Sequence, residues 1–245
     1  GRPTKCLTQD TKNKRLAFAH ANKNRNWRRV MFTDRCKFLS RYPGCKVKRT
    51  RWSLKSKRHE GGAFQPTHPS ALNVYAGVTA YGVTAMHAVT GTTGLTTNFK
   101  NMAGQGSRSI TSDEYRHVGG TTLLPDGKRI FGQKGETEWV LQQDGDPTHP
   151  AIKPVINEFN KTSGNQVTLL KNWPPNSPDL SPIENVWGWV QAEVAKKGCK
   201  SFDEFKQEVI KTFKNIPIEM CEHLIDSVPA RLERVVKTNG GKAGY

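Results

Sequence analysis

The sequence predicts a mixed α/β sheet with a helical C-terminal tail. Three observations lead to this fold class. Short apolar runs between turn residues dominate the first half of the chain, which is typical of strands. Strand and helix patterns then alternate, as they do when helices cover a sheet, and the last quarter shows only helical periodicity.

The elements of the first half are mostly strands. Residues 30–33 are an apolar run that predicts a buried strand ending at Asp34. Two turn sequences, Tyr42-Pro43-Gly44 and Tyr81-Gly82, each predict a hairpin. In chain order we expect a helix over 10–24 capped by Asp10, the strand 30–33, a hairpin of 36–41 with 46–52, a loop over 53–70, a hairpin of 72–78 with 85–89, and a helix over 111–118 capped by Ser112.

The second half alternates and then becomes helical. Residues 139–143 predict a strand that runs into Asp144, and residues 167–170 predict another. The helix expected over 181–197 has the clearest apolar stripe, made of Ile183, Val186, Trp187, Val190 and Val194. The other expected elements are a helix over 150–160, a polar turn over 160–165, a helix over 201–213 capped by Ser201, and two short helices after Pro217.

Length and composition exclude several classes. The 245 residues, of which 35% are hydrophobic and 24% charged, suit one large domain with its own core. No apolar run approaches the roughly 18 residues that a membrane helix needs. The five cysteines are odd in number and form no CxxC pair, which argues against a zinc knuckle and favours a reducing compartment.

Positive charge is concentrated at the start of the chain. The first 60 residues hold 19 Lys and Arg against 3 Asp and Glu, so nearly all of the net charge of +17 lies there. Such a field attracts a polyanion, most often nucleic acid, although a solvated basic face or a nuclear-import signal would look the same. The candidate DNA-binding residues are Lys46, Lys48, Arg49, Arg51, Lys55, Lys57 and Arg58.

Three carboxylates stand where an α/β sheet forms its sites. Asp34 and Asp144 follow expected strands, and Glu184 opens the helix expected over 181–197. Converging carboxylates would hold Mg²⁺, which prefers oxygen ligands. Two such ions can activate an attacking oxygen and stabilise a leaving oxygen on phosphorus. The pattern therefore indicates phosphoryl-transfer chemistry.

These carboxylates also have ordinary structural explanations. A strand-end Asp is usually a turn residue or a helix cap. Ser181-Pro182-Ile183-Glu184 has the form of a capping box, which alone would account for Glu184. Against this, Glu184 lies beside Gly188, Gln191 and Ala195 at the edge of the apolar stripe, where small residues leave room for a substrate.

Three segments resemble the catalytic domain of mariner-superfamily transposases. They are VMFTDRCKF at 30–38, VLQQDGDPTH at 140–149 and WPPNSPDLSPIENVW at 173–187, of which the last is the longest and most specific. Residues 14–27 and the C-terminal residues 221–245 also resemble the family, so the resemblance covers nearly the whole chain. It implies an RNase H-like fold, in which a mixed sheet is flanked by helices and followed by a helical C-terminal tail.

The resemblance also implies residue roles and partners. Asp34, Asp144 and Glu184 match the family's acidic triad, which holds two Mg²⁺ ions, with Mn²⁺ as a substitute. Asp146, His149 and Asn185 are candidates for residues behind this triad, and Asp179 is expected to order a loop. The implied activity is cut-and-paste DNA transposition, with transposon ends and target DNA at TA dinucleotides as substrates. The implied protein is a homodimer in the nucleus, and no membrane is expected among its partners.

The chain departs from the family's pattern in three places. Arg35 follows Asp34 where an acidic or small residue is usual, and the family's DNDPKH reads DGDPTH. Asp144 and Glu184 are separated by 39 residues, and we expect the excess in the turn over 160–165. Residues 1–28 are expected to be a basic helical lead-in after an absent N-terminal DNA-binding region, which makes this chain a fragment, and residues 29–245 the catalytic domain.

Two other functions stay open at this stage. A domesticated or inactive copy would bind DNA without cutting it, although the intact triad argues against this. A different RNase H-like nuclease or integrase is the second alternative, and an integrase would be expected to carry a His/Cys zinc module that these cysteines do not form.

Overall fold

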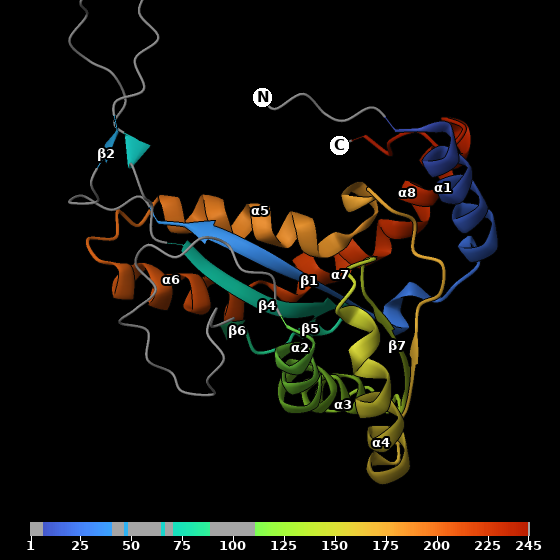
Figure 1. Cartoon of the computed structure of the whole chain (residues 1–245), viewed down its shortest axis with the longest axis horizontal. Helices are drawn as coiled ribbons and strands as arrows, with labels where there is room; N and C mark the ends of the chain where they lie inside the picture. The colour runs from blue at the N-terminus through green and yellow to red at the C-terminus, as the bar shows by residue number, and fades with distance from the viewer. Residues whose placement is uncertain (1–6, 41–46, 49–64, 67–70, 89–110, 245) are drawn as a thin grey trace, which may run out of the picture.

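The computed structural model describes residues 7–40, 47–48, 65–66, 71–88 and 111–244, and these residues are built around a mixed six-stranded sheet (Figure 1). Its strands lie in the order β5-β4-β1-β7-β8, with β6 paired to β4. β4 runs antiparallel to β1, β7 runs parallel to β1, and β8 runs parallel to β7. The strands are β1 (Val30–Leu39), β4 (Ala71–Thr79), β5 (Gly82–Val83), β6 (His87–Ala88), β7 (Glu138–Gln142) and β8 (Gln166–Leu169).

Helices cover both faces of this sheet (Figure 1). The helices of the described residues are α1 (Gln9–Asn22), α2 (Ser112–Val118), α3 (Leu124–Gly132), α4 (Lys153–Ser163), α5 (Pro182–Ala195), α6 (Phe202–Lys214), α7 (Ile218–Asp226) and α8 (Val228–Lys237). Short helical turns lie between them: η1 (Trp27–Arg29), η3 (Gly119–Leu123), η4 (His149–Ile152) and η5 (Pro178–Leu180). None of these described helices is both long and apolar enough to cross a membrane. The predicted fold class is confirmed, helical C-terminal region included.

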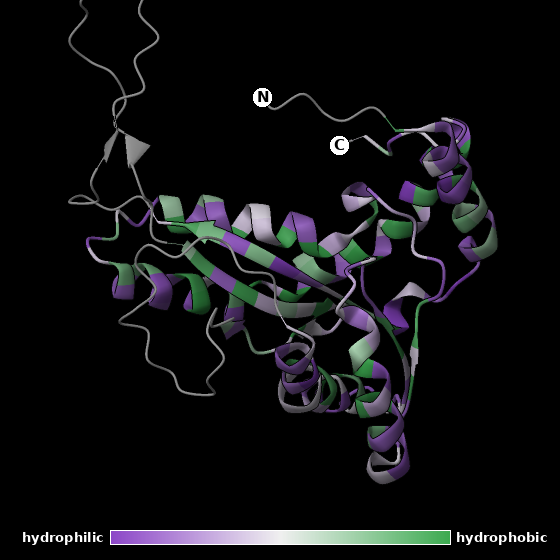
Figure 2. Cartoon of the chain, viewed as in Figure 1, coloured by the Kyte–Doolittle hydropathy of each residue, from purple (hydrophilic) through white to green (hydrophobic). Residues whose placement is uncertain are grey.

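Alternate residues of β1 face two different hydrophobic cores. Val30 and Phe32 pack in the core formed with α5 to α8, whereas Met31 packs in the core formed with α2, α3 and α4. Successive side chains of a strand point to opposite faces, so a strand buried on both faces is apolar at every position. Figure 2 shows the resulting contrast between β4, which is mostly hydrophobic, and α1, which is largely hydrophilic.

β1 is longer than the sequence pattern indicates. The apolar run stops at Asp34, but the strand continues to Leu39 because β4 pairs with it throughout this stretch. Asp34 therefore lies within the strand, and the expectation that it ends the strand is wrong. The expected hairpin of 36–41 with 46–52 is also wrong in the described residues: Cys36 to Leu39 pair with β4, and β2 (Val47–Lys48) pairs with β3 (Gln65–Pro66).

The second expected hairpin is confirmed, while two expected helix caps are displaced. β5 and β6 both pair antiparallel with β4 after a turn at Ala80-Tyr81, and Gly82 begins β5. Thr8 caps α1 in place of Asp10, because the Thr8 side chain accepts from the backbone N–H of Thr11. Thr111 caps α2 in place of Ser112, through a capping box with Glu114. The cap of α6 by Ser201 is confirmed.

α3 was not expected from the sequence, because Pro125 and Gly127 are unfavourable inside helices. Pro125 lies in the first turn of α3, a position that tolerates proline. A Cβ on Gly127 would lie 2.5 Å from the Trp139 ring, so glycine lets α3 approach β7 closely. The turn expected over 160–165 is helical up to Ser163, and the helix ends at Gly164, whose φ is 71°.

A buried ion pair joins both ends of the described chain to the loop before α5. Arg15 of α1 is fully buried, and its guanidinium donates to the Asp179 carboxylate at 2.7 and 2.9 Å. It also donates to the Gly240 carbonyl at 3.0 Å, and Asp179 accepts from the Ala243 N–H at 2.6 Å. We call this group of contacts the terminal clasp. Asp179 therefore orders its loop, which is the role that the family resemblance implies.

Candidate active site

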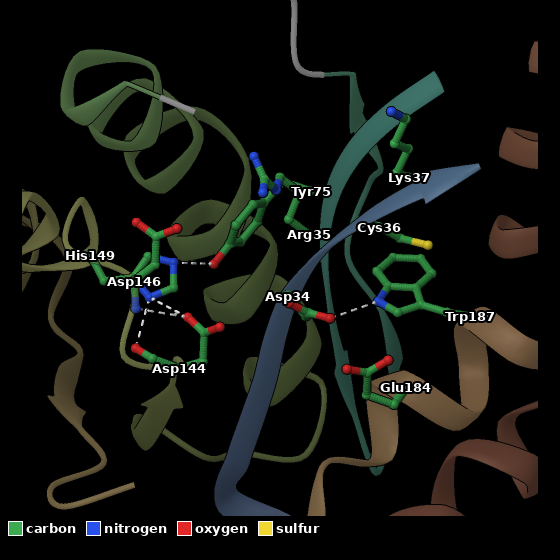
Figure 3. Close-up of a pocket in the computed structure, with 10 residues that line it drawn as sticks. All are labelled: Asp34, Arg35, Cys36, Lys37, Tyr75, Asp144, Asp146, His149, Glu184 and Trp187. Atoms are coloured by element: carbon green, nitrogen blue, oxygen red, sulfur yellow. Dashed lines mark hydrogen bonds and ion pairs between the residues drawn. The ribbon is translucent and has the colours of Figure 1, made fainter. Parts of the chain in front are cut away.

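A pocket of about 290 Å³ opens where β7 ends beside β1. β7 pairs with β1 only from Val30 to Phe32, so the following residues of β1 have no partner on that edge among the described strands. Side chains from both faces of β1 therefore border the pocket (Figure 3). Its lining residues are Asp34, Arg35, Cys36, Lys37, Tyr75, Asp144, Asp146, His149, Glu184 and Trp187.

Asp34 lies half-buried in the middle of β1 and faces α5. The indole Nε1 of Trp187 donates to its Oδ2 at 3.2 Å. Burial, followed by the negative charges of Glu184 and Asp144, raises the pKa of Asp34 to about 7. The site thus disfavours the ionised form of Asp34 as long as no cation balances it.

Asp144 lies two residues beyond the end of β7, on the other side of the pocket. Its Oδ1 accepts from Nδ1 of His149 at 3.0 Å and from the backbone N–H of Asp146 at 3.1 Å. The hydrogen bond from His149 is the main reason that the pKa of Asp144 is lowered. Asp144 is therefore ionised and held in place, although its side chain remains 58% exposed.

Glu184 lies in the first turn of α5 and its carboxylate extends toward Asp34 (Figure 3). Ser181 is the N-cap of this helix, but its side chain makes no capping hydrogen bond, so the capping-box explanation of Glu184 is wrong. Partial burial in the pocket and the charge of Asp144 raise the pKa of Glu184.

The three candidate residues behind the triad differ in position. Asp146 accepts from the backbone N–H and the hydroxyl of Thr148 at 2.8 and 2.7 Å and so shapes the turn after Asp144. Burial opposes ionisation of Asp146, but these bonds outweigh it and lower its pKa. His149 is buried against Asp144. Asn185 does not belong to the residues that line the pocket.

The predicted DNA-binding residues stay a prediction. Lys48 lies in β2, where the backbone alone is described. The other six lie outside the described residues: Lys46, Arg49, Arg51, Lys55, Lys57 and Arg58.

The pocket has the donor chemistry of a hard-cation site. Carboxylate oxygens are the ligands that Mg²⁺ prefers. Burial first, and neighbouring carboxylates second, raise the pKa values of Asp34 and Glu184, and a bound cation would offset both effects. In the described part of the chain, no three acidic, His or Cys side chains stand close enough to hold an ion as they are. Asp34, Asp144 and Glu184 fit the metal as donors, and coordination requires them to move closer together.

Several lining residues were not predicted as functional. The helical spacing of Trp187 predicts a core residue, and Tyr75 lies in an expected strand with no functional motif. Arg35 stood out only as a departure from the family's pattern. Cys36 and Lys37 carry no signal of their own, because the pocket is visible only once β1 is known to continue past Asp34.

A mixed sheet with three carboxylates at one pocket is the arrangement expected of an RNase H-like catalytic domain, and comparison with known proteins confirms this class. The family model of the DDE superfamily endonucleases matches residues 29–206. The chain belongs to this family. It is 29% identical over 247 residues to the Tc3 transposase of Caenorhabditis elegans, an alignment that covers 100% of this chain and 66% of that relative.

Solved structures of Mos1 transposase share the fold. The Mos1 paired-end complex with the left transposon end matches with a TM-score of 0.70 at 15% identity, over 100% of this chain and 67% of that one. The Mos1 catalytic domain, solved with Raltegravir and Mg, matches with a TM-score of 0.65 at 14% identity, over 96% of this chain and 98% of that one. The predicted mariner-superfamily catalytic domain is confirmed, and the chain spans about two thirds of Tc3 transposase.

Proposed function

We propose that this chain cleaves and transfers DNA strands as the catalytic domain of a cut-and-paste transposase. One observation carries the proposal: Asp34 from β1, Asp144 after β7 and Glu184 from α5 border a single pocket although they are far apart in the sequence. Three separate elements bring these carboxylates together, and a cation site is the chemistry that such a cluster serves.

The three carboxylates act as ligands for two divalent cations, Mg²⁺ or Mn²⁺. Asp34, Asp144 and Glu184 would together hold the two ions. When bound, the cations supply activation of the attacking oxygen and stabilisation of the leaving oxygen. Trp187 orients Asp34 by its hydrogen bond, and His149 orients Asp144.

DNA is the proposed substrate and partner. Mos1 structures contain a transposon end or a strand-transfer complex, and others contain Mg or Mn, which supports the same chemistry for this chain. A nuclear homodimer that joins two transposon ends to TA target sites follows from the family resemblance. The basic residues of 46–58 would hold the DNA through its phosphates.

A nicking assay on supercoiled plasmid tests the proposal. In Mg²⁺ or Mn²⁺ the wild type should nick the plasmid, whereas Asp144→Asn and Glu184→Gln should not, because each removes a charged ligand. Asp10→Asn is a matched control, since Asp10 is exposed and pairs only with Lys14 in the described structure. DNA retention on filters should be equal for all four proteins.

Two results would contradict the proposal. Nicking by Asp144→Asn at the wild-type rate excludes the pocket as the site of cleavage. DNA retention without any nicking by the wild type favours the inactive, DNA-binding alternative.

A further inference from the structure

Asp144 is backed by a chain of buried polar side chains that reaches β4 and α2. We propose that His149, Tyr75 and Tyr115 form a positioning relay that fixes the Asp144 carboxylate for cation binding. The relay deepens the proposed function and rests on its metal centre. His149 is 5% exposed, Tyr75 1% and Tyr115 0%, so every link behind Asp144 is shielded from water.

His149 joins the relay to Asp144. Its Nδ1 lies 3.0 Å from Oδ1 of Asp144 and 2.9 Å from the backbone carbonyl oxygen of the same residue. Both are acceptors, so Nδ1 carries a hydrogen whether the ring is neutral or charged. With the backbone N–H of Asp146, this bond engages Oδ1 and leaves Oδ2 for a cation.

Tyr75 and Tyr115 hold the imidazole from two other elements (Figure 3 shows Tyr75 and His149). The Tyr75 hydroxyl of β4 lies 3.1 Å from Nε2 of His149. The Tyr115 ring of α2 lies against the imidazole, with 4.6 Å between ring centroids. The Tyr115 hydroxyl donates to Oε1 of Gln143 at 2.9 Å, and Gln143 directly precedes Asp144. The relay therefore touches Asp144 through its side chain and through its neighbour in the chain.

Packing alone does not explain these hydroxyl groups. Phe at either tyrosine would fill the same core without a polar atom to satisfy, and a buried hydroxyl is unfavourable unless it is hydrogen-bonded. Here the hydroxyls bond to His149 and Gln143, which both border Asp144. In metal sites, partners behind a ligand fix its orientation, and their loss weakens metal binding by about 10–100-fold.

Mn²⁺ binding to the whole chain without DNA tests the relay. Isothermal titration calorimetry would compare the wild type, Tyr75→Phe and Tyr81→Phe. Tyr81→Phe is the matched control, because the Tyr81 ring packs against Phe131 and its hydroxyl has no hydrogen bond to His149, Tyr75 or Tyr115 among the described contacts. Since Tyr75 is one bond further from the ion than His149, we expect Tyr75→Phe to weaken Mn²⁺ binding about threefold to tenfold. Tyr81→Phe should bind as the wild type does.

Thermal unfolding and one further variant separate the possible outcomes. Wild-type affinity in a Tyr75→Phe protein that unfolds at the normal temperature overturns the relay. Equal Mn²⁺ binding by Asp144→Asn and the wild type instead refutes the metal centre. The ¹⁵N spectrum of the His149 ring, recorded without metal, then decides on the relay: a change in Tyr75→Phe but not in Tyr81→Phe supports it, and an unchanged spectrum overturns it.

Discussion

Two glycines on different helices should respond in opposite ways to the same substitution. Gly127 of α3 faces β7, and a Cβ there would lie 2.5 and 2.6 Å from two atoms of the Trp139 ring and 3.1 Å from the Met31 methyl. Gly188 lies in the middle of α5 on its exposed face, and a Cβ there meets no atom within 4 Å. Replacement by Ala therefore tests packing at one site and helix propensity at the other.

The contacts set the expected magnitudes. Ala is favoured over Gly inside a helix, so Gly188→Ala should raise the free energy of unfolding by about 0.5–1 kcal/mol. At Gly127 the added methyl group meets a buried, rigid ring, and overpacking of this kind costs about 1–3 kcal/mol. The propensity gain offsets part of this cost, and an approach of 2.5 Å to a rigid ring is severe, so Gly127→Ala should lower the free energy of unfolding by about 2 kcal/mol.

Urea denaturation of both variants beside the wild type measures these changes. The denaturation midpoint should rise for Gly188→Ala and fall for Gly127→Ala, with the urea dependence of the free energy unchanged in both. A Gly127→Ala protein as stable as the wild type would refute the close packing of α3 on β7. Gly188 lies one helical turn after Glu184, so Gly188→Ala also reports on the site: higher stability with less nicking indicates that DNA passes over this face.

Three further predictions concern other parts of the chain. Asp179→Ala should lower the free energy of unfolding by about 3–5 kcal/mol, because it leaves the buried Arg15 without its carboxylate. The double variant Asp179→Ala/Arg15→Met should recover part of this loss. A loss under about 1 kcal/mol for Asp179→Ala, measured by urea denaturation, would contradict this prediction. Burial raises the pKa of the Cys221 thiol to about 11, so at pH 8 iodoacetamide should leave Cys221 unmodified in the native chain. Mass spectrometry measures this, and labelling of Cys221 at the rate of an exposed thiol would contradict it. Replacing Lys48, Arg49 and Arg51 with Ala should flatten the slope of the DNA-binding constant against salt concentration, both on logarithmic scales, by about one unit per lost phosphate contact, whatever the DNA sequence. An unchanged slope would show that these residues do not contact the phosphates.

The sequence predicts this fold best where a pattern depends on nearby residues. The alternation of strands and helices and the stripe of α5 follow from local periodicity, and the structure confirms both. The end of β1 depends on β4, which lies more than 30 residues further along the chain, so the polar residue Asp34 does not mark the end of the strand. α3 was missed because Gly127 is explained only by its contact with Trp139.

The candidate site likewise contains residues that a local motif reveals and residues that only the fold brings together. Asp34, Asp144 and Glu184 lie in motifs that can be read along the chain, and they border one pocket. Tyr75 and Tyr115 lie in segments without a motif, and only the folded chain brings them to His149. The roles of the basic residues in 46–58, the division between residues 28 and 29, the dimer and the nuclear location stay predictions.

The terminal clasp has a consequence for the time at which the site can form during synthesis. The Arg15 guanidinium bonds to Gly240, which is 225 residues later, and both ends hold the loop that leads into α5 and Glu184. Chains emerge from the ribosome N-terminus first, so Arg15 can pair with Asp179 once that residue has been made, but its bond to Gly240 must wait until Gly240 follows. A chain that ends before Gly240 keeps the pair of Arg15 with Asp179 but lacks the bonds from Gly240 and Ala243, so it should hold the loop before Glu184 less firmly. The terminal clasp is therefore complete only after synthesis has passed Ala243.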